Sequence, residues 1–151
     1  MKKDDIPVRK APDVRPIKDL PDFIKAAIAE FWQKHGLEPH ESTVVTFHDA
    51  IYTSRPMAQD MFVHECVHYV RQGGGQDIEL AKQYVDRYLT DDAFRLEEEL
   101  MAYREQYKFL LKHMNRPQAF EHVKVLAAHL SSPLYGNIIS FGQALSAIMK
   151  A

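Results

Sequence analysis

The stretch His64-Glu65-Cys66-Val67-His68 is the most informative part of this chain. It has the form H-E-x-x-H and lies in a predicted helix. Residues four apart on a helix share one face, about 6 Å apart along the axis, so both imidazoles can bind one zinc ion. The glutamate directly after the first histidine can reach a metal-bound water rather than the metal. One short segment therefore supplies two candidate zinc ligands and a candidate general base.

The helix that carries this motif is predicted to run from about Met57 to Gln72. Apolar residues recur beside its histidines, which is typical of a helix that packs on one face. Gly73-Gly74-Gly75 ends it, because glycine readily adopts the left-handed backbone that follows a helix. The three glycines do not indicate a phosphate loop, since no strand precedes them and no Lys-Ser/Thr pair follows.

A catalytic zinc site needs a third protein ligand and an open position for water. The run Glu97-Glu98-Glu99 lies in the first half of a second, long helix. Successive helical positions rotate by about 100°, so the three glutamates cannot all face solvent. Glu99 shares a face with Ala102 and Tyr103, and the small alanine would let two helices approach closely. Glu98 shares a face with Met101 and Ala102, so Glu98 and Glu99 are both candidates for the third ligand.

An H-E-x-x-H motif followed by an E-x-x-A signature resembles the gluzincin type of zinc metallopeptidase, especially small H-E-x-x-H proteins encoded by phages and bacteria. The resemblance covers roughly residues 43–107. Its matching positions are His64, Glu65, His68, Gln72, Glu99, Ala102, Tyr103, Arg104 and Gln106. A metzincin would instead carry a third histidine six residues after His68, where this chain has Gly74.

The resemblance implies a role for each of four residues. His64, His68 and Glu99 would be the zinc ligands. Glu65 would be the general base. It also implies Zn²⁺ as the cofactor, a peptide or protein substrate, and an α+β fold in which the edge strand of a small sheet pairs with an extended peptide.

The residues outside the motif predict a mostly helical α+β fold. β-Branched and aromatic residues at 43–47 and 50–53 predict a small sheet or hairpin. This sheet is expected to pack on the H-E-x-x-H helix and on the long helix that carries Glu99. The other helices are expected from Pro21 toward Gly36, Asp77 to Leu89, Thr90 to about Met114, Pro117 to Leu130 and Ser140 to Met149. The expected capping residues are Asp19, Thr90, and Ser140 with Gln143.

Length and proline spacing predict the domain organisation. A chain of 151 residues is long enough for one domain with its own core, here a zincin-like domain at residues 20–151. Pro7, Pro12 and Pro16 prevent a helix before it, so residues 1–19 are expected to form an extended or disordered N-terminal arm. The arm is either free or laid across the domain or a partner.

Charge and composition exclude several classes of partner and location. A net charge of −2 and a pI of about 6.4 indicate no nucleic-acid partner. The single cysteine, Cys66, cannot form an internal disulfide. Residues 1–15 lack the apolar core of a Sec signal, and no apolar run approaches the ~20 residues of a membrane span. The expected location is the cytoplasm, with packaging in a virion or non-classical export left open. Oligomeric state is not indicated.

Other polar residues have weaker claims to a role. Tyr103, Tyr135 and His129 are candidates to stabilise the oxyanion of a tetrahedral intermediate, although each is also explained by packing. Cys66 lies about 200° around the helix from His64, so it is expected to pack as a small hydrophobic residue.

The sequence therefore predicts a zinc-dependent hydrolase that acts as a peptidase, with Glu65 as the general base. Two alternatives stay open. One is a regulatory or binding protein that holds zinc without turnover, and the other is a zinc amidase acting on cell-wall peptides.

Overall fold

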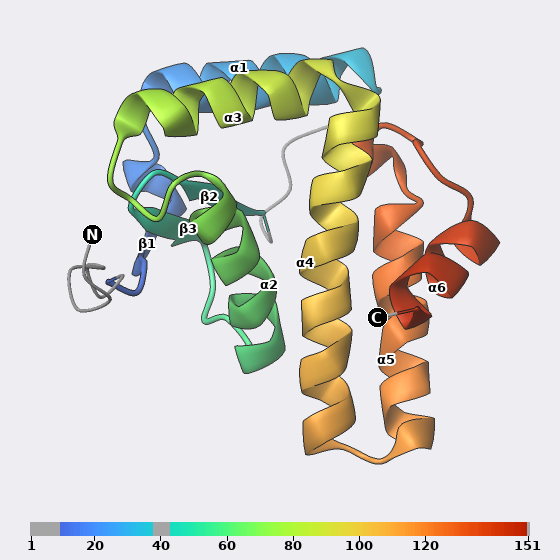
Figure 1. The fold of residues 1–151 in the computed structure, drawn as a ribbon. Coiled ribbons are helices and arrows are strands. Elements are labelled where there is room, and N and C mark those ends of the chain that lie inside the picture. Colours follow the sequence, from blue (N-terminus) through green and yellow to red (C-terminus); the bar gives the residue numbers. More distant parts are fainter. Residues whose placement is uncertain (1–9, 38–42, 151) are drawn as a thin grey trace, which may run out of the picture.

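Six α-helices and a three-stranded sheet make up the described part of the chain, residues 10–37 and 43–150 of the computed structural model (Figure 1). The elements in order are β1 (Asp13–Pro16), η2 (Ile17–Asp19), α1 (Asp22–Lys34), β2 (Val44–Phe47), β3 (Ala50–Thr53), α2 (Gln59–Arg71), α3 (Ile78–Thr90), α4 (Asp92–His113), α5 (Arg116–Leu130), η3 (Pro133–Tyr135) and α6 (Phe141–Met149). The predicted class, a mostly helical α+β fold with a small sheet, is confirmed. Within these residues, none of the helices combines the length and apolar character that a membrane span requires.

Helix starts show where local capping was predicted well and where it was not. Ser140 and Gln143 form the expected capping box of α6. The prediction that Thr90 caps the long helix is wrong: Thr90 ends α3, and the Asp91 side chain accepts from the Phe94 N–H at the start of α4. The charged Asp91 carboxylate is a stronger acceptor than a hydroxyl, and it lies at the positive end of the α4 dipole.

The predicted capping residue of α1, Asp19, is also wrong. Asp19 lies in the short 3₁₀ helix η2 and does not cap α1. The residue that precedes α1 is Pro21, which makes no side-chain capping bond. Proline cannot donate a backbone N–H, and the first turn of a helix needs none at that position.

The sheet has a strand that the sequence did not predict. β2 and β3 form the expected antiparallel hairpin, with Phe47 opposite Ala50. β1 then pairs with β3 in parallel, with Asp13 opposite Ala50, so the order is β1-β3-β2. The last part of the expected arm is thus a strand, while residues 1–9 lie outside the described residues. Pro16 is tolerated because β1 is an edge strand, where a missing N–H leaves no ladder bond unmade.

Two clusters of buried apolar side chains hold the helices and the sheet together. One joins α4, α5 and α6, and the other joins α1, α3 and the sheet. The motif helix α2 packs against α4 and also contacts β2 and β3 (Figure 1). The residues that α2 buries are His64, Glu65, His68 and Tyr69. His64, Glu65 and His68 come from the motif, so α2 turns the ionisable residues of the motif toward the interior.

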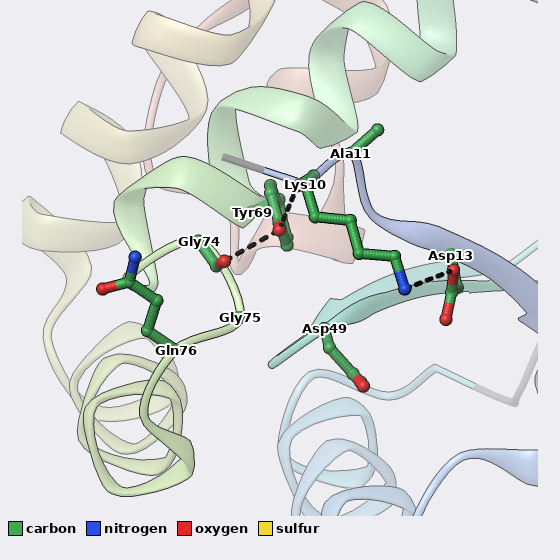
Figure 2. Close-up of a pocket in the computed structure, with 8 residues that line it drawn as sticks. All are labelled: Lys10, Ala11, Asp13, Asp49, Tyr69, Gly74, Gly75 and Gln76. Carbon is green, nitrogen blue, oxygen red and sulfur yellow. Dashed lines mark hydrogen bonds and ion pairs between the residues drawn. The ribbon is translucent and has the colours of Figure 1, made fainter. Parts of the chain in front are cut away.

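The end of α2 is attached to the N-terminal segment and to the turn between β2 and β3. The Tyr69 hydroxyl lies 2.5 Å from the Lys10 carbonyl oxygen and 2.7 Å from that of Gly74 (Figure 2). Gly75 has a φ of +78°, and a Cβ there would lie 3.3 Å from the Asp49 backbone. A pocket of about 320 Å³ lies between these segments, and no predicted metal ligand lines it.

Candidate metal centre

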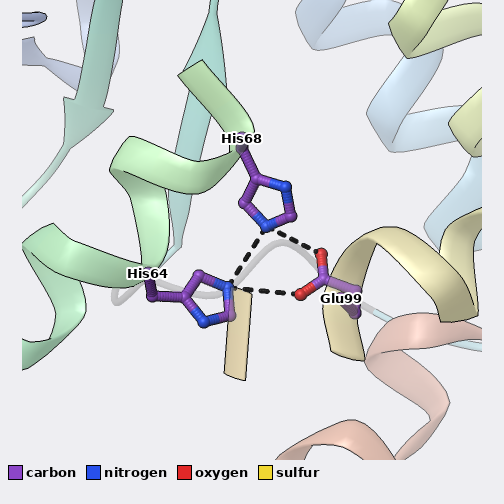
Figure 3. A group of neighbouring side chains, drawn as sticks. All are labelled: His64, His68 and Glu99. Carbon is purple, nitrogen blue, oxygen red and sulfur yellow. Dashed lines mark hydrogen bonds and ion pairs between the residues drawn. The ribbon is translucent and has the colours of Figure 1, made fainter. Parts of the chain in front are cut away.

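His64, His68 and Glu99 converge in the interior, two from α2 and one from α4 (Figure 3). Their side chains are between 3% and 8% exposed. His64 Nε2 lies 3.2 Å from His68 Nε2 and 3.2 Å from Glu99 Oε2, while His68 Nε2 lies 3.2 Å from Glu99 Oε1. The one turn between the histidines and the packing of α2 on α4 together produce this group.

The group has the size and the donors that a metal ion requires. In a tetrahedral site with bonds of about 2.0–2.1 Å, neighbouring donor atoms lie about 3.3–3.4 Å apart. The observed separations of 3.2 Å are close to that value. Buried Glu99 Oε2 also has no hydrogen-bond partner among the described residues. Two imidazoles and a carboxylate are a donor set used by catalytic zinc sites, so these residues fit a divalent metal.

A hydrogen-bond chain fixes the tautomer of His64. The Gln106 side-chain amide donates from Nε2 to Asp60 Oδ2 at 2.8 Å. Its Oε1 then faces His64 Nδ1 at 3.0 Å and accepts from it. Because Nδ1 carries the proton, the Nε2 lone pair points toward His68 and Glu99, where a metal would bind.

The run of three glutamates divides among three environments. Glu97 is exposed, whereas Glu98 and Glu99 are both buried. Glu98, the alternative third ligand, accepts three short contacts from the Arg71 guanidinium, the closest at 2.8 Å from Nη2 to Oε1. It lies outside the His64, His68 and Glu99 group. The geometry therefore favours Glu99, one residue further along α4, as the third ligand.

Glu65 lies beside the group without joining it. Its Oε1 is 4.0 Å from His64 Nε2, and its side chain is 9% exposed. Thr46, on β2, donates from its hydroxyl to Glu65 Oε2 at 2.6 Å. At this distance the Glu65 carboxylate is not itself a metal ligand. It can still reach a water molecule that lies between it and a metal ion.

The weaker candidates lie in different places. The Tyr103 ring contacts the His64 ring edge-on, with centroids 4.4 Å apart, and its hydroxyl lies 2.7 Å from that of Tyr135. Burial and the charge of Glu99 raise the pKa of both tyrosines well above the ordinary value, so both keep their protons. His129 is exposed on α5. Cys66 is half-buried, and burial raises the pKa of its thiol.

Several neighbours of the site were not predicted from sequence. The sequence predicts Thr46 only as part of the strand at 43–47, and Tyr84 and Tyr88 only as part of the helix from Asp77 to Leu89. Gln106 matched the family pattern without a stated role. Tyr84 and Tyr88 are four residues apart, and this spacing predicts two tyrosine hydroxyls on one face of the helix. The contact of Thr46 with Glu65 joins two elements, and no spacing rule predicts it.

Without metal, the site holds a proton on His68. Burial lowers the pKa of His68, but the charge and hydrogen bond of Glu99 outweigh burial and raise this pKa to about 9. Burial by itself raises the pKa of Glu99, but His68 and His64 together lower it well below its usual range. At neutral pH a metal ion must therefore displace a proton from His68.

Metal affinity is expected to increase with pH up to about 9, the pKa of His68 in the metal-free protein. Below that pH, each unit of acidification should weaken Zn²⁺ binding about tenfold, because one proton competes with the ion. Titration calorimetry at pH 7, in two buffers of different ionisation enthalpy, should show about one proton released per ion. Equal binding heats in the two buffers would contradict this prediction.

No protein-family model, curated protein or solved structure matches this chain. The assignment of the site therefore depends on its own geometry. That geometry is a buried His64, His68 and Glu99 group on an H-E-x-x-H helix and its neighbour, consistent with an H-E-x-x-H type of metal site.

Proposed function

We propose that this protein is a zinc-dependent peptidase of the gluzincin type. The observation that carries the proposal is the position of Glu65, which is held by Thr46 at the edge of the metal group rather than within it. A zinc site that serves only storage or structural stability needs metal ligands. It does not need a further oriented carboxylate beside them. A hydrolase needs that carboxylate to move protons.

The residues around the centre divide the work of amide hydrolysis. Zinc held by His64, His68 and Glu99 would supply a Lewis acid and lower the pKa of a water molecule. Glu65 accepts a proton from the water that attacks the carbonyl carbon. As the carbon–nitrogen bond breaks, Glu65 passes this proton to the leaving nitrogen. The Tyr103 ring packs edge-on against the His64 ring, and burial keeps its hydroxyl protonated, so Tyr103 would be the donor to a developing oxyanion.

The substrate that fits this arrangement is an extended peptide or protein segment. β2 is an outer strand of the sheet, and its Thr46 side chain contacts Glu65. A peptide paired along β2 would therefore lie next to the general base. Strand addition of this kind gives main-chain hydrogen bonds that do not depend on substrate side chains.

A zinc-holding protein without turnover is the second candidate, and the burial of the site favours it. The side chains of His64, Glu65 and Glu99 are only 3%, 9% and 3% exposed. A catalytic centre of this kind would need a movement that admits substrate.

Metal analysis and a cleavage screen on the same purified protein test the proposal. One zinc per chain is expected in wild type, and His64→Ala and His68→Ala should each lose it, because each removes one of three ligands. The wild type should cleave denatured proteins, and a chelator should stop it. Cleavage of peptidoglycan but not of protein would indicate a cell-wall amidase. Full metal content in either histidine variant would place the metal elsewhere.

A further inference from the structure

Helix α3 places two tyrosine hydroxyls on the metal group from outside it. Tyr84 and Tyr88 are one helical turn apart, with nearly parallel rings whose centroids are 6.3 Å apart. The Tyr84 hydroxyl lies 3.1 Å from His68 Nδ1. The Tyr88 hydroxyl lies 2.6 Å from Glu99 Oε1. One helix face therefore reaches two of the three candidate ligands, one on α2 and the other on α4.

The direction of the Tyr84 bonds follows from the protons that are present. Both oxygens of Glu98 accept from the Arg71 guanidinium, so Glu98 acts as a charged acceptor. Tyr84 has a single hydroxyl proton and gives it to Glu98 Oε2 at 3.1 Å. Its oxygen can then only accept from His68 Nδ1–H. Neutral His68 therefore has its lone pair on Nε2, the atom that faces the metal position.

Tyr88 makes an equivalent choice between the two oxygens of Glu99. Its hydroxyl donates to Oε1 at 2.6 Å and uses one of the two lone pairs of that atom, and His68 Nε2 lies 3.2 Å from the same oxygen. Buried Oε2 has no hydrogen-bond partner in the described residues and lies 3.2 Å from His64 Nε2. Oε2 is thus the carboxylate oxygen left available to bind an ion through one atom.

We propose that Tyr84 and Tyr88 form a tyrosine clamp, a pair of positioning residues that present His68 Nε2 and Glu99 Oε2 to the metal. The inference rests on the proposed metal centre and deepens it. α3 lies between α2 and α4 in the chain, and its two tyrosines contact one candidate ligand on each of those helices. The clamp holds one ligand from α2 and one from α4 in a fixed relation, so that the site is formed before the metal arrives.

Three matched substitutions in the full-length protein test the clamp, each removing one oxygen and no carbon. Tyr84→Phe and Tyr88→Phe should each raise the dissociation constant for Zn²⁺ about 10–100-fold, the usual cost of losing a partner of a metal ligand. Tyr107→Phe, a buried tyrosine in the apolar cluster of α4, α5 and α6, is the control and should leave the constant unchanged. The measurement is competition with a chelator of known affinity.

Cobalt supplies a readout that a purely structural role would not change. Tyr88→Phe frees Glu99 Oε1, so the carboxylate can bind Co²⁺ through both oxygens and raise its coordination number. The Co²⁺-saturated variant should then show weaker visible absorption than Co²⁺-saturated wild type and Tyr107→Phe. Thermal unfolding of the metal-free proteins checks that packing is retained.

The outcomes separate the clamp from the metal centre itself. Unchanged Zn²⁺ affinity in both Tyr84→Phe and Tyr88→Phe, beside a tightly binding wild type, would overturn the clamp alone. Equal weakening by Tyr107→Phe would also overturn it, since the effect would then be general. A wild-type protein that binds neither Zn²⁺ nor Co²⁺ would overturn the proposed centre and the clamp with it.

Discussion

Replacing Glu99 with alanine is expected to remove stoichiometric zinc from the protein. Glu99 is 3% exposed, and its carboxylate lies 3.2 Å from the Nε2 atoms of both His64 and His68. The variant keeps only two ligands, and both are neutral. Losing a residue that hydrogen-bonds to a metal ligand already lowers metal affinity about 10–100-fold. Losing the ligand itself should therefore lower the affinity more than about 100-fold. Chelator competition and metal analysis after dialysis measure the loss.

The neighbouring glutamates provide the controls for this experiment. Glu97→Ala should bind zinc like wild type, because Glu97 is exposed. Glu98→Gln keeps an oxygen that can accept from Tyr84 and should weaken binding far less than Glu99→Ala. If Glu98→Gln loses zinc and Glu99→Ala retains it, the third ligand has been assigned to the wrong residue. Glutamine is similar in size to glutamate, so the contact between α2 and α4 is expected to remain intact in Glu98→Gln.

Replacing Glu65 with glutamine is expected to abolish most turnover while leaving zinc in place. Glutamine preserves the shape of the side chain and still accepts a hydrogen bond from Thr46. It cannot accept a proton at neutral pH. Catalysis should therefore fall by about 10²–10⁴-fold, the range typical of a positioned acid–base group. Zinc content should not change, because Glu65 lies outside the metal group.

The comparison needs a substrate, so wild type and Glu65→Gln are first compared on denatured proteins and cell extracts. Products that appear with wild type and not with the variant identify both the activity and the substrate class. Thr46→Val and Thr46→Ser then form a matched pair, because only serine keeps the hydroxyl that reaches Glu65. Identical behaviour of zinc-loaded wild type and Glu65→Gln on every substrate would favour the candidate without turnover.

The pairing of His64 with His68 was predictable because it is local. Four residues make about one helical turn, so the two histidines must share a face in any regular helix. The presence of a buried glutamate was predictable for the same reason, since three consecutive glutamates span about 200° of the α4 surface. Helical spacing did not decide which glutamate meets the histidines, because Glu98 and Glu99 are both buried; the E-x-x-A resemblance favoured Glu99.

The sequence did not predict one strand that pairs with a distant segment, and it did not distinguish between two adjacent candidate capping residues. β1 pairs with β3 across more than thirty residues, and its prolines pointed to an arm instead. Asp91 displaced Thr90 as the cap of α4, although both types of residue cap helices well. Spacing rules compare neighbours in sequence, so they cannot rank adjacent caps or find a parallel edge strand.

By itself, the sequence determined that the fold is mostly helical, and it identified His64 and His68 as candidate ligands with Glu65 beside them. These features follow from helical periodicity, which is a property of the local backbone. The tertiary structure decided how α4 is rotated against α2, which turns Glu98 toward Arg71 and Glu99 toward the histidines. It also decided which imidazole nitrogens face the metal position, through Gln106 and Tyr84. These choices depend on hydrogen bonds between residues 16 to 42 positions apart, and only packing brings such residues together.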